Sequence, residues 1–381
     1  MRAVFDFFAT AAKGTEGALR DELKSLRLPG VRADRGGVHF RGTLADGMKA
    51  CLWSRTAMRV LLSLGAQEAK GADALYDAVF SIPWEDHLSA RRTFAVHATV
   101  RSSELTHSHF VALRAKDAIV DRMRERTGDR PSVDTHKPDV HVVVHLARDR
   151  VEVSLDLSGE PLHRRGWRVE AKEAPLRETL AAAVLLLGGY DPKQPFLDPM
   201  CGSGTLAIEA ALIARNIAPG RGRHFGFMRW PAWGDEEARA FRALQEEARS
   251  LALPKAPAPI LARDRFADPL EIAHRNAERA GVAGSIEFEQ QDARDLVPLP
   301  PGCQIFVNPP YGERLGGKRL QLEGLYRGFG EAYAPFEEEV PLVVLSGSPL
   351  FERAFGHRVR WRHPLYNGPL EAHLLRYGPR R

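Results

Sequence analysis

The sequence predicts an α/β protein in which a doubly wound parallel sheet in the second half follows an α+β region in the first half. Two observations support this fold class. From about residue 176, apolar segments with helical spacing alternate with short apolar strands, the pattern of a parallel sheet covered by helices. Before that point, strand patterns separated by only a few residues indicate antiparallel pairing.

The first half divides into two segments and a joint. Residues 1–42 predict a strand, a helix, a turn at Pro29-Gly30 and a second strand. Within residues 43–157 we predict helices over 44–53 and 110–126 and strands over 93–100, 140–146 and 151–157. The last two strands are four residues apart and should form a hairpin. Residues 158–175 are polar and basic, and we expect them to join this half to the last segment, residues 176–381.

Composition limits the class of protein. Of the 381 residues, 44% are hydrophobic and 27% are charged, which is ordinary for a soluble globular protein. The longest apolar run, residues 180–187, is far shorter than the roughly 20 residues that cross a bilayer, and the start lacks the apolar core of a signal peptide. Three widely spaced cysteines exclude a disulfide framework and a cysteine-based zinc site. We therefore expect a cytoplasmic protein without a membrane contact or a metal.

The net charge of +5 is concentrated in the first half. Through Glu170 the sequence has 27 Lys and Arg against 23 Asp and Glu, whereas the remainder has 27 against 26. An excess of positive charge on one half is typical of proteins that bind an anionic partner, and we expect that partner to contact the first half.

The strongest local signal is FLDPMCGSGT at residues 196–205, which an apolar helix follows. This pattern predicts a strand that ends in a glycine turn and opens a helix. Gly202 and Gly204 allow the backbone to approach a ligand closely, and Asp198 stands at the tip of the strand. A single Gly-x-Gly turn also occurs as an ordinary packing turn, so its weight depends on the strands that come after it.

Three later strand patterns also end in polar side chains, namely Asp264, Asp292 and Asn308. The carboxyl ends of parallel strands meet at one edge of the sheet, where open α/β sheets bind ligands. We therefore expect Asp198 and these three residues to line one crevice. A nicotinamide dinucleotide is disfavoured, because its turn needs a third glycine where this sequence has Ala207 or Ile208.

The tetrapeptide at residues 308–311, Asn-Pro-Pro-Tyr, suits an exocyclic amine as the nucleophile. The lone pair of such an amine is delocalised into its ring. The side-chain oxygen of Asn308 and the carbonyl of Pro309 can accept hydrogen bonds from the two N–H groups of the amine. These hydrogen bonds would direct the lone pair toward an electrophile. Pro309 and Pro310 fix the backbone, and Tyr311 offers a ring face on which an extruded base can stack. This chemistry requires neither a covalent intermediate nor a metal.

Together these residues resemble a class I S-adenosylmethionine-dependent methyltransferase of the amino-methylating type, whose domain is Rossmann-like. The resemblance implies S-adenosylmethionine as the cofactor, with Asp198 and the glycine turn at its methionine end, Asp264 on the ribose hydroxyls and Asp292 on the adenine amino group. It makes Asn308, Pro309, Pro310 and Tyr311 the catalytic motif. The implied cofactor-binding residues are Asp198, Met200, Gly202, Gly204, Thr205, Asp264, Asp292 and Ala293.

The first half resembles the ferredoxin-like and THUMP RNA-binding region of 23S rRNA guanine-N2-methyltransferases of the RlmL type. With residues 308–315 and 367–370, the resembling segments extend over nearly the whole chain: 8–14, 36–40, 52–55, 94–159, 162–168 and 174–183. The resemblance implies methyl transfer to guanine N2, with 23S rRNA or a pre-ribosomal particle as the partner. Some members carry a second, fused methyltransferase domain, which we expect to be absent because the sequence ends at Arg381.

Three alternatives remain open. Related THUMP enzymes methylate a guanine in tRNA, and the Asn-Pro-Pro-Tyr motif also serves adenine N6 in DNA. An RNA-binding assembly factor could retain the fold without catalysis. The THUMP-like half disfavours DNA, and the four intact polar strand tips disfavour a non-catalytic role.

An insertion between the first two acidic strand tips, residues 219–253, contains arginines interleaved with aromatic residues. Rings stack on unpaired bases and guanidinium groups meet phosphates, although aromatic residues that pack over the sheet would give the same pattern. Together with the basic joint, the insertion supplies the candidate RNA contacts Arg164, Arg165, Arg221, Arg223, Phe225, Arg229 and Trp230.

Overall fold

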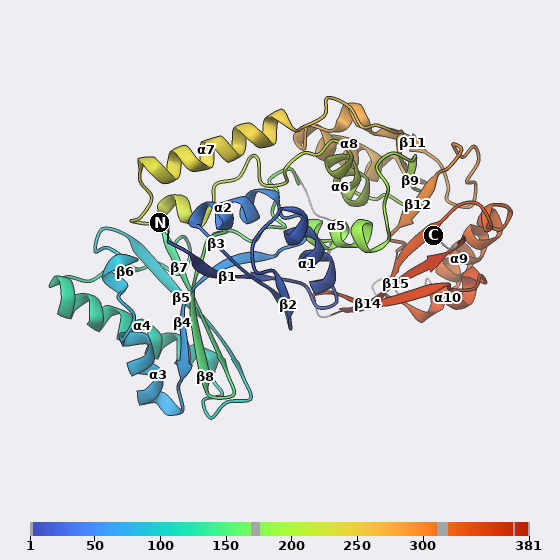
Figure 1. Cartoon of the computed structure of the whole chain (residues 1–381). Helices are drawn as coiled ribbons and strands as arrows, with labels where there is room; N and C mark the ends of the chain where they lie inside the picture. Colours follow the sequence, from blue (N-terminus) through green and yellow to red (C-terminus); the bar gives the residue numbers. More distant parts are fainter. Residues whose placement is uncertain (1–2, 169–175, 311–318, 369, 380–381) are drawn as a thin grey trace.

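The computed structural model describes residues 3–168, 176–310, 319–368 and 370–379. These residues form two sheets, one in each half of the chain, with helices packed against them (Figure 1). The predicted fold class, a doubly wound parallel sheet preceded by an α+β region, is confirmed.

The first sheet has eight strands in the order β2-β3-β1-β4-β8-β7-β5-β6. Its strands are β1 (Phe5–Thr10), β2 (Arg32–Asp34), β3 (Gly37–Gly42), β4 (Arg59–Glu68), β5 (Thr93–Arg101), β6 (Ser132–Val133), β7 (Val140–Ala147) and β8 (Arg150–Asp156). The helices of this half are α1 (Glu16–Ser25), α2 (Leu44–Trp53), α3 (Gly71–Phe80), the short η1 (Trp84–Asp86) and α4 (Ser108–Thr127). Because β4 pairs with β1 on one side and with β8 on the other, the boundary that we place at residue 42 falls within one continuous sheet.

The hairpin predicted between the last two strands of this half is confirmed. Strands β7 and β8 pair antiparallel, and Arg148 and Asp149 form the turn with φ of 54° and 57°. Two positive φ values in a two-residue turn match the right-handed twist of the flanking strands. The turn therefore sets the register of β7 against β8.

The second sheet has seven strands in the order β11-β10-β9-β12-β13-β15-β14. Its strands are β9 (Phe196–Asp198), β10 (Ile260–Asp264), β11 (Glu287–Gln290), β12 (Gln304–Val307), β13 (Leu342–Ser346), β14 (Trp361–Asn367) and β15 (Leu370–Tyr377). The longer helices are α5 (Glu178–Leu187), α6 (Thr205–Ala214), α7 (Asp235–Ser250), α8 (Ala267–Arg279), α9 (Arg319–Tyr333) and α10 (Pro349–Phe355), and η2 (Gly226–Arg229), η3 (Ala283–Ser285) and η5 (Ala334–Phe336) are single turns. Strands β9 to β13 are parallel, and β14 and β15 close the sheet with antiparallel pairing.

Local sequence explains why the crossover helices differ in burial. Helix α6 is apolar except for Thr205 and Glu209 and is almost completely buried, since it packs between the sheet and α5. Helix α7 has acidic residues in its first turn, where the positive end of the helix dipole stabilises their negative charge. It buries only Phe241 and Ala248. It therefore lies on the outside of the molecule.

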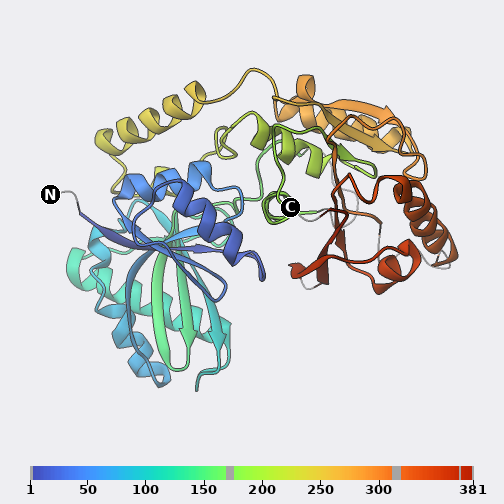
Figure 2. The same ribbon diagram turned by 45° about the vertical axis from the view of Figure 1, so that its right-hand side comes forward.

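The insertion leaves the second half and packs against the first. Phe225, Phe227 and Trp230 are buried in the apolar cluster of the first sheet, together with residues such as Leu52 and Leu157. Figures 1 and 2 both show α7 extending over the first half, beside α2. The two halves therefore share a core, and the insertion supplies part of it. No helix among the described residues is long and apolar enough to cross a membrane.

Candidate active site at the strand tips

The structure brings the four predicted strand tips together in one row. Strands β11, β10, β9 and β12 are adjacent and parallel, so their carboxyl ends lie at the same edge. In register, Asp198 is opposite Ala262 of β10, two residues before Asp264. The edge therefore carries Asp292, Asp264, Asp198 and Asn308 in that spatial order, as the prediction of one crevice requires.

The glycine turn between β9 and α6 needs both of its glycines, for different reasons. Gly202 has φ of 53°, and a side chain there would meet open space, so the turn leaves room beside its backbone. Gly204 has φ of 82°, and an added Cβ would lie 2.9 Å from the Cβ of Ala273 on α8. Positive φ values favour glycine at both positions. The amide of Asn276 on α8 also donates to the carbonyl of Ser203 at 3.0 Å, which ties the turn to that helix.

Asp264 holds the turn from the side of β10. Its carboxylate accepts hydrogen bonds from the backbone amides of Gly202 at 3.0 Å and Phe266 at 3.1 Å. Burial raises the pKa of Asp264, while these two amides oppose the rise. The side chain of Phe266, two residues after Asp264, is exposed. Sequence reasoning missed Phe266, and its place just beyond a strand-tip acid was the signal available.

Asp198 is a buried carboxyl group without a cationic partner among the described residues. It is 2% exposed, it accepts a hydrogen bond from the amide of Met200 at 3.2 Å, and it forms no ion pair with any residue that the structure describes. Burial raises the pKa of Asp198 well above its usual value, and the neighbouring Asp264 adds to the rise. A buried carboxylate is costly unless it is paired, so this site favours a cationic ligand. The methionine end of S-adenosylmethionine, with its ammonium group, has the matching charge.

Asp292 differs from Asp198 and Asp264 because its carboxylate forms an ion pair with an arginine. Its carboxylate is bound by Arg294, whose Nη2 is 2.7 Å away and whose backbone amide also donates at 3.0 Å. These contacts lower the pKa of Asp292. Ala293 beside it is buried. The carboxylate is thus ionised and partly exposed, and its contact with an adenine amino group remains a prediction.

The side-chain oxygen of Asn308 is buried and has no hydrogen-bond partner among the described residues. A buried, unpaired acceptor is costly, and one placed at a strand tip is suited to a ligand that donates an N–H bond. Pro310, two residues further on, accepts a hydrogen bond at its carbonyl from the hydroxyl of Tyr326 on α9. Sequence reasoning missed Tyr326, since a buried tyrosine on a helix carries no distinctive pattern. Tyr311 lies outside the described residues.

The seven candidate RNA contacts divide into two groups. Arg164, Arg221 and Arg229 are exposed. The side chains of Arg165, Arg223, Phe225 and Trp230 are buried, where they contact protein and not solvent. Phe225 and Trp230 belong to the shared core. We therefore assign the four buried residues to the junction between the halves.

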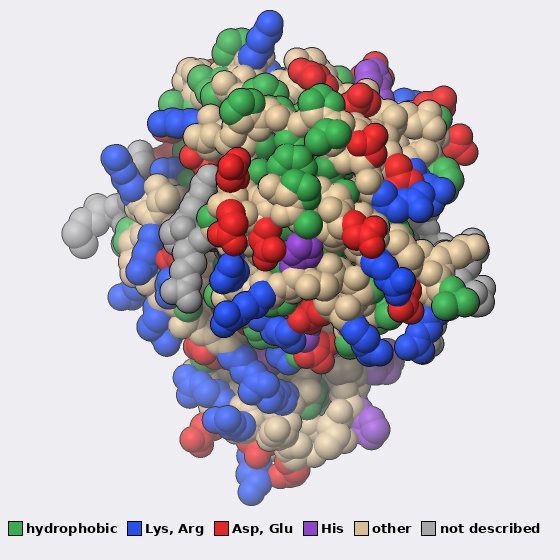
Figure 3. Space-filling model, turned by 90° about the vertical axis from the view of Figure 1, so that its right-hand side faces the viewer, with side chains coloured by type: hydrophobic (Ala, Val, Ile, Leu, Met, Phe, Trp, Pro, Cys, Tyr) green, Lys and Arg blue, Asp and Glu red, His purple; other side chains and the backbone are tan. Residues whose placement is uncertain are grey.

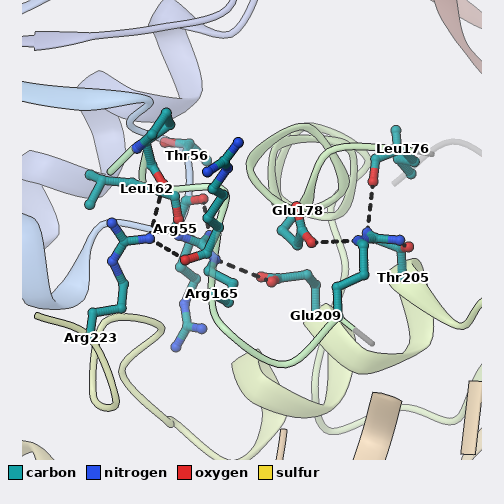
Figure 4. Close-up of polar contacts among 12 residues, drawn as sticks. Arg55, Thr56, Leu162, Arg165, Leu176, Glu178, Thr205, Glu209 and Arg223 are labelled. Carbon is teal, nitrogen blue, oxygen red and sulfur yellow. Dashed lines mark hydrogen bonds and ion pairs between the residues drawn. The ribbon is translucent and has the colours of Figure 1, made fainter. Parts of the chain in front are cut away.

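The buried arginines of this junction bind carbonyl oxygens of the joint (Figure 4). Arg223 donates to the carbonyls of Glu160 at 2.6 Å and Pro161 at 2.9 Å, and also to that of Arg164. Arg165 donates to the carbonyls of Leu162 and Arg55 and pairs with Glu209 of α6. The guanidinium groups of these two residues are thus held inside the protein.

Comparison with known proteins places this geometry in a family. The model of the RMKL-like methyltransferase domain matches residues 165–376, the THUMP domain model matches residues 69–156, and the RlmL ferredoxin-like domain model matches residues 6–61. The ribosomal RNA large subunit methyltransferase K/L of Syntrophotalea carbinolica is 42% identical over 99% of this chain and 54% of its own length. The chain thus spans about half the length of the curated relatives it matches.

Two solved structures are similar over essentially their whole length. SMU.472, crystallised in complex with SAH, is 32% identical with a TM-score of 0.90, and the match covers all of both chains. A protein from Listeria monocytogenes, named as a predicted N6-adenine-specific DNA methylase, is 34% identical with a TM-score of 0.89 over 99% of this chain and 97% of its own. The family model covers more than half of the chain and includes all four strand tips, so this chain belongs to the RMKL-like methyltransferase domain family.

Proposed function

We propose that this chain transfers a methyl group from S-adenosylmethionine to the exocyclic N2 amine of a guanine in 23S rRNA. Two neighbouring strand tips support this most. Among the described residues the buried side-chain oxygen of Asn308 has no hydrogen-bond partner, and the buried carboxyl of Asp198 in the same row forms no ion pair. The first suits an N–H donor and the second suits a cation. An amine substrate and an S-adenosylmethionine-type cofactor meet both requirements at adjacent strands.

The cofactor supplies an electrophilic methyl group on a positively charged sulfur. Asp198 would pair with the ammonium of its methionine end, and the open backbone at Gly202 would leave room for it. Asp264 and Asp292 would accept hydrogen bonds from the ribose hydroxyls and the adenine amino group. SMU.472, which is similar over its whole length, was crystallised with SAH, the demethylated form of this cofactor.

The chain's part in the chemistry is to orient the amine. The Asn308 oxygen and the Pro309 carbonyl would accept hydrogen bonds from the two N–H groups of the amine, so that the nitrogen lone pair points at the methyl carbon. Transfer of the methyl group would form the N–C bond as the C–S bond breaks, which would leave a neutral thioether. The methylated amine would release one proton to water. Tyr326 would hold Pro310 in place through a hydrogen bond to its carbonyl.

RNA is the proposed partner because the first half matches the THUMP domain model and carries the larger excess of positive charge. Figure 3 shows Lys and Arg side chains gathered on the lower part of one face, at the height of α3, α4 and β8 in Figure 1. The relative from Syntrophotalea carbinolica is named as a ribosomal RNA large subunit methyltransferase, which favours 23S rRNA and a cytoplasmic location.

The test is a methyl-transfer assay with the full chain and labelled S-adenosylmethionine on three substrates: 23S rRNA, total tRNA and duplex DNA. We expect incorporation into 23S rRNA alone. Incorporation into tRNA alone would show that tRNA, and not 23S rRNA, is the substrate. Incorporation into DNA would support the activity by which the Listeria monocytogenes protein is named. No incorporation into any of them, with cofactor bound, would favour the non-catalytic alternative.

A further inference from the structure

We propose that Arg168 is the positioning residue of the cofactor loop, residues 202–205, and that it sets the affinity of the chain for S-adenosylmethionine. This inference rests on the proposed function, because it assumes that the loop binds the cofactor. The sequence places Arg168 in a basic joint expected to face RNA. The structure instead turns its guanidinium inward, onto the loop.

Arg168 contacts both hydroxyl groups of the loop. Its Nη1 lies 3.3 Å from the Oγ of Ser203, and its Nη2 lies 3.1 Å from the Oγ1 of Thr205. Thr205 is the first residue of α6, so the guanidinium reaches the point where the turn becomes a helix. Hydrogen bonds with a charged donor are about twice as strong as neutral ones. The loop is therefore held by a charged group from outside the strand–turn–helix unit.

The guanidinium is itself fixed from the opposite side. Its Nε donates to the carboxylate of Glu178 at 2.9 Å, and its Nη2 also donates to the carbonyl of Leu176 at 3.1 Å. The Arg168 and Glu178 side chains are 16% and 5% exposed. Figure 4 shows Leu176, Glu178 and Thr205 grouped together at the start of α5 and α6. The planar fork of an arginine can satisfy these partners at the same time, which a lysine cannot.

The loop needs such an anchor because its glycines allow many backbone conformations. Gly202 and Gly204 both have positive φ, and glycine loses more conformational freedom than other residues when it is ordered. Asp264 holds the loop at Gly202, and Asn276 holds it at the Ser203 carbonyl. Arg168 adds the contacts to the side chains of Ser203 and Thr205. A loop ordered before binding costs the ligand less free energy to bind.

The test compares Arg168→Ala and Arg168→Lys with a matched control in the full chain. Arg122 is the control, since its Nη2 pairs with Glu85 at 2.7 Å and its side chain is 12% exposed, but it lies in the first half. SAH binding is measured by calorimetry and unfolding by thermal melting. We expect Arg168→Ala to weaken SAH binding about 10-fold or more, as for the loss of charged hydrogen bonds. Arg168→Lys should lie between Ala and the wild type.

A kinetic readout separates positioning from a general loss of stability. Arg168→Ala should raise the KM for S-adenosylmethionine while kcat at saturation changes less than about twofold, because Arg168 does not touch the amine. Arg122→Ala should lower the melting temperature without weakening SAH binding. Wild-type SAH affinity in Arg168→Ala, or an equal loss in Arg122→Ala, would overturn this proposal and leave the proposed function standing. A wild-type chain that does not bind SAH would overturn both.

Discussion

Nε of Arg165 lies 3.4 Å from the Oε1 of Glu209, and both side chains are at most 2% exposed. The pair joins the segment after the first sheet to α6, the helix that follows the cofactor loop. Arg55 of the first half reaches the same pair through its carbonyl, which accepts a hydrogen bond from Arg165. The first half is therefore connected to the helix of the cofactor loop through buried charges and not only through apolar packing.

Loss of the Glu209 charge should destabilise the whole chain. Glu209→Gln keeps the shape of the side chain but leaves the buried guanidinium of Arg165 without its counter-charge, which typically costs about 3–5 kcal/mol. The control is Glu160→Gln, whose exposed pair with Arg164 should contribute at most about 1 kcal/mol. Urea unfolding followed by circular dichroism measures both. Equal midpoints for the two variants would show that the buried pair contributes no more than an exposed one.

Asn308→Ala should separate binding from chemistry. The amide is needed when the amine is aligned for attack, so turnover should fall roughly 100-fold or more. The affinity for SAH should stay within about twofold, since the residues proposed to bind the cofactor follow other strands. Calorimetry with SAH and a single-turnover methyl-transfer assay give the two values. Near-normal turnover in this variant would mean that Asn308 does not direct the amine.

The affinity for SAH should fall as the pH is lowered. Burial holds the pKa of Asp198 above its usual value of 3.8. In the proposed binding mode the ammonium of the ligand pairs with the ionised carboxylate. Below the raised pKa that carboxyl is protonated, and binding must release the proton, so affinity decreases there and levels off above it. The ligand-free fold responds in the opposite sense, because a raised folded-state pKa contributes stability at low pH that is lost as the pH rises through it.

Calorimetric titrations from weakly acidic to neutral pH check this prediction, with Asp198→Asn as the control. The variant should bind SAH more weakly at neutral pH. Its pH dependence should be smaller and should come from Asp264, whose pKa is also raised by burial. A variant with the same pH profile as the wild type would remove Asp198 from the ligand's ammonium site.

Charge reversal at the exposed arginines should weaken RNA binding without affecting the fold. Arg164→Glu with Arg229→Glu should reduce affinity for rRNA fragments and flatten the salt dependence by about 0.7–0.9 log units for each phosphate that the protein no longer binds. Arg20→Glu on α1 is the control, because Arg20 is exposed and pairs with its neighbour Asp21. Gel-shift titrations at several salt concentrations give the slopes. An unchanged slope in the double variant would place the phosphate-binding residues elsewhere.

The row of strand tips could be predicted from the sequence because its signals are local. Each parallel strand is a short apolar run that ends in a polar residue, and parallel strands bring such ends to one edge. Asp198, Asp264, Asp292 and Asn308 therefore lie in the predicted row. The environment of each side chain could not be predicted, because the pairing of Asp292 with Arg294 depends on the local turn and on side-chain conformations.

The role of the insertion could not be predicted, because its pattern has two physical meanings. Arginines alternating with aromatic residues suit both an RNA contact and a packed junction. The structure shows Phe225 and Trp230 in the core of the first sheet and Arg223 on carbonyls of the joint. These interactions join segments about 60 residues or more apart, and no local periodicity reports them. The same holds for Arg168, which lies in the basic joint but is turned toward the cofactor loop.

The most direct test of the proposed function is mass spectrometry of the nucleosides of 23S rRNA after reaction with the full chain and S-adenosylmethionine, with Asn308→Ala in parallel. We predict that N2-methylguanosine appears with the wild-type chain and is nearly absent with the variant. N6-methyladenosine in place of N2-methylguanosine, or equal amounts of N2-methylguanosine from both proteins, would contradict it.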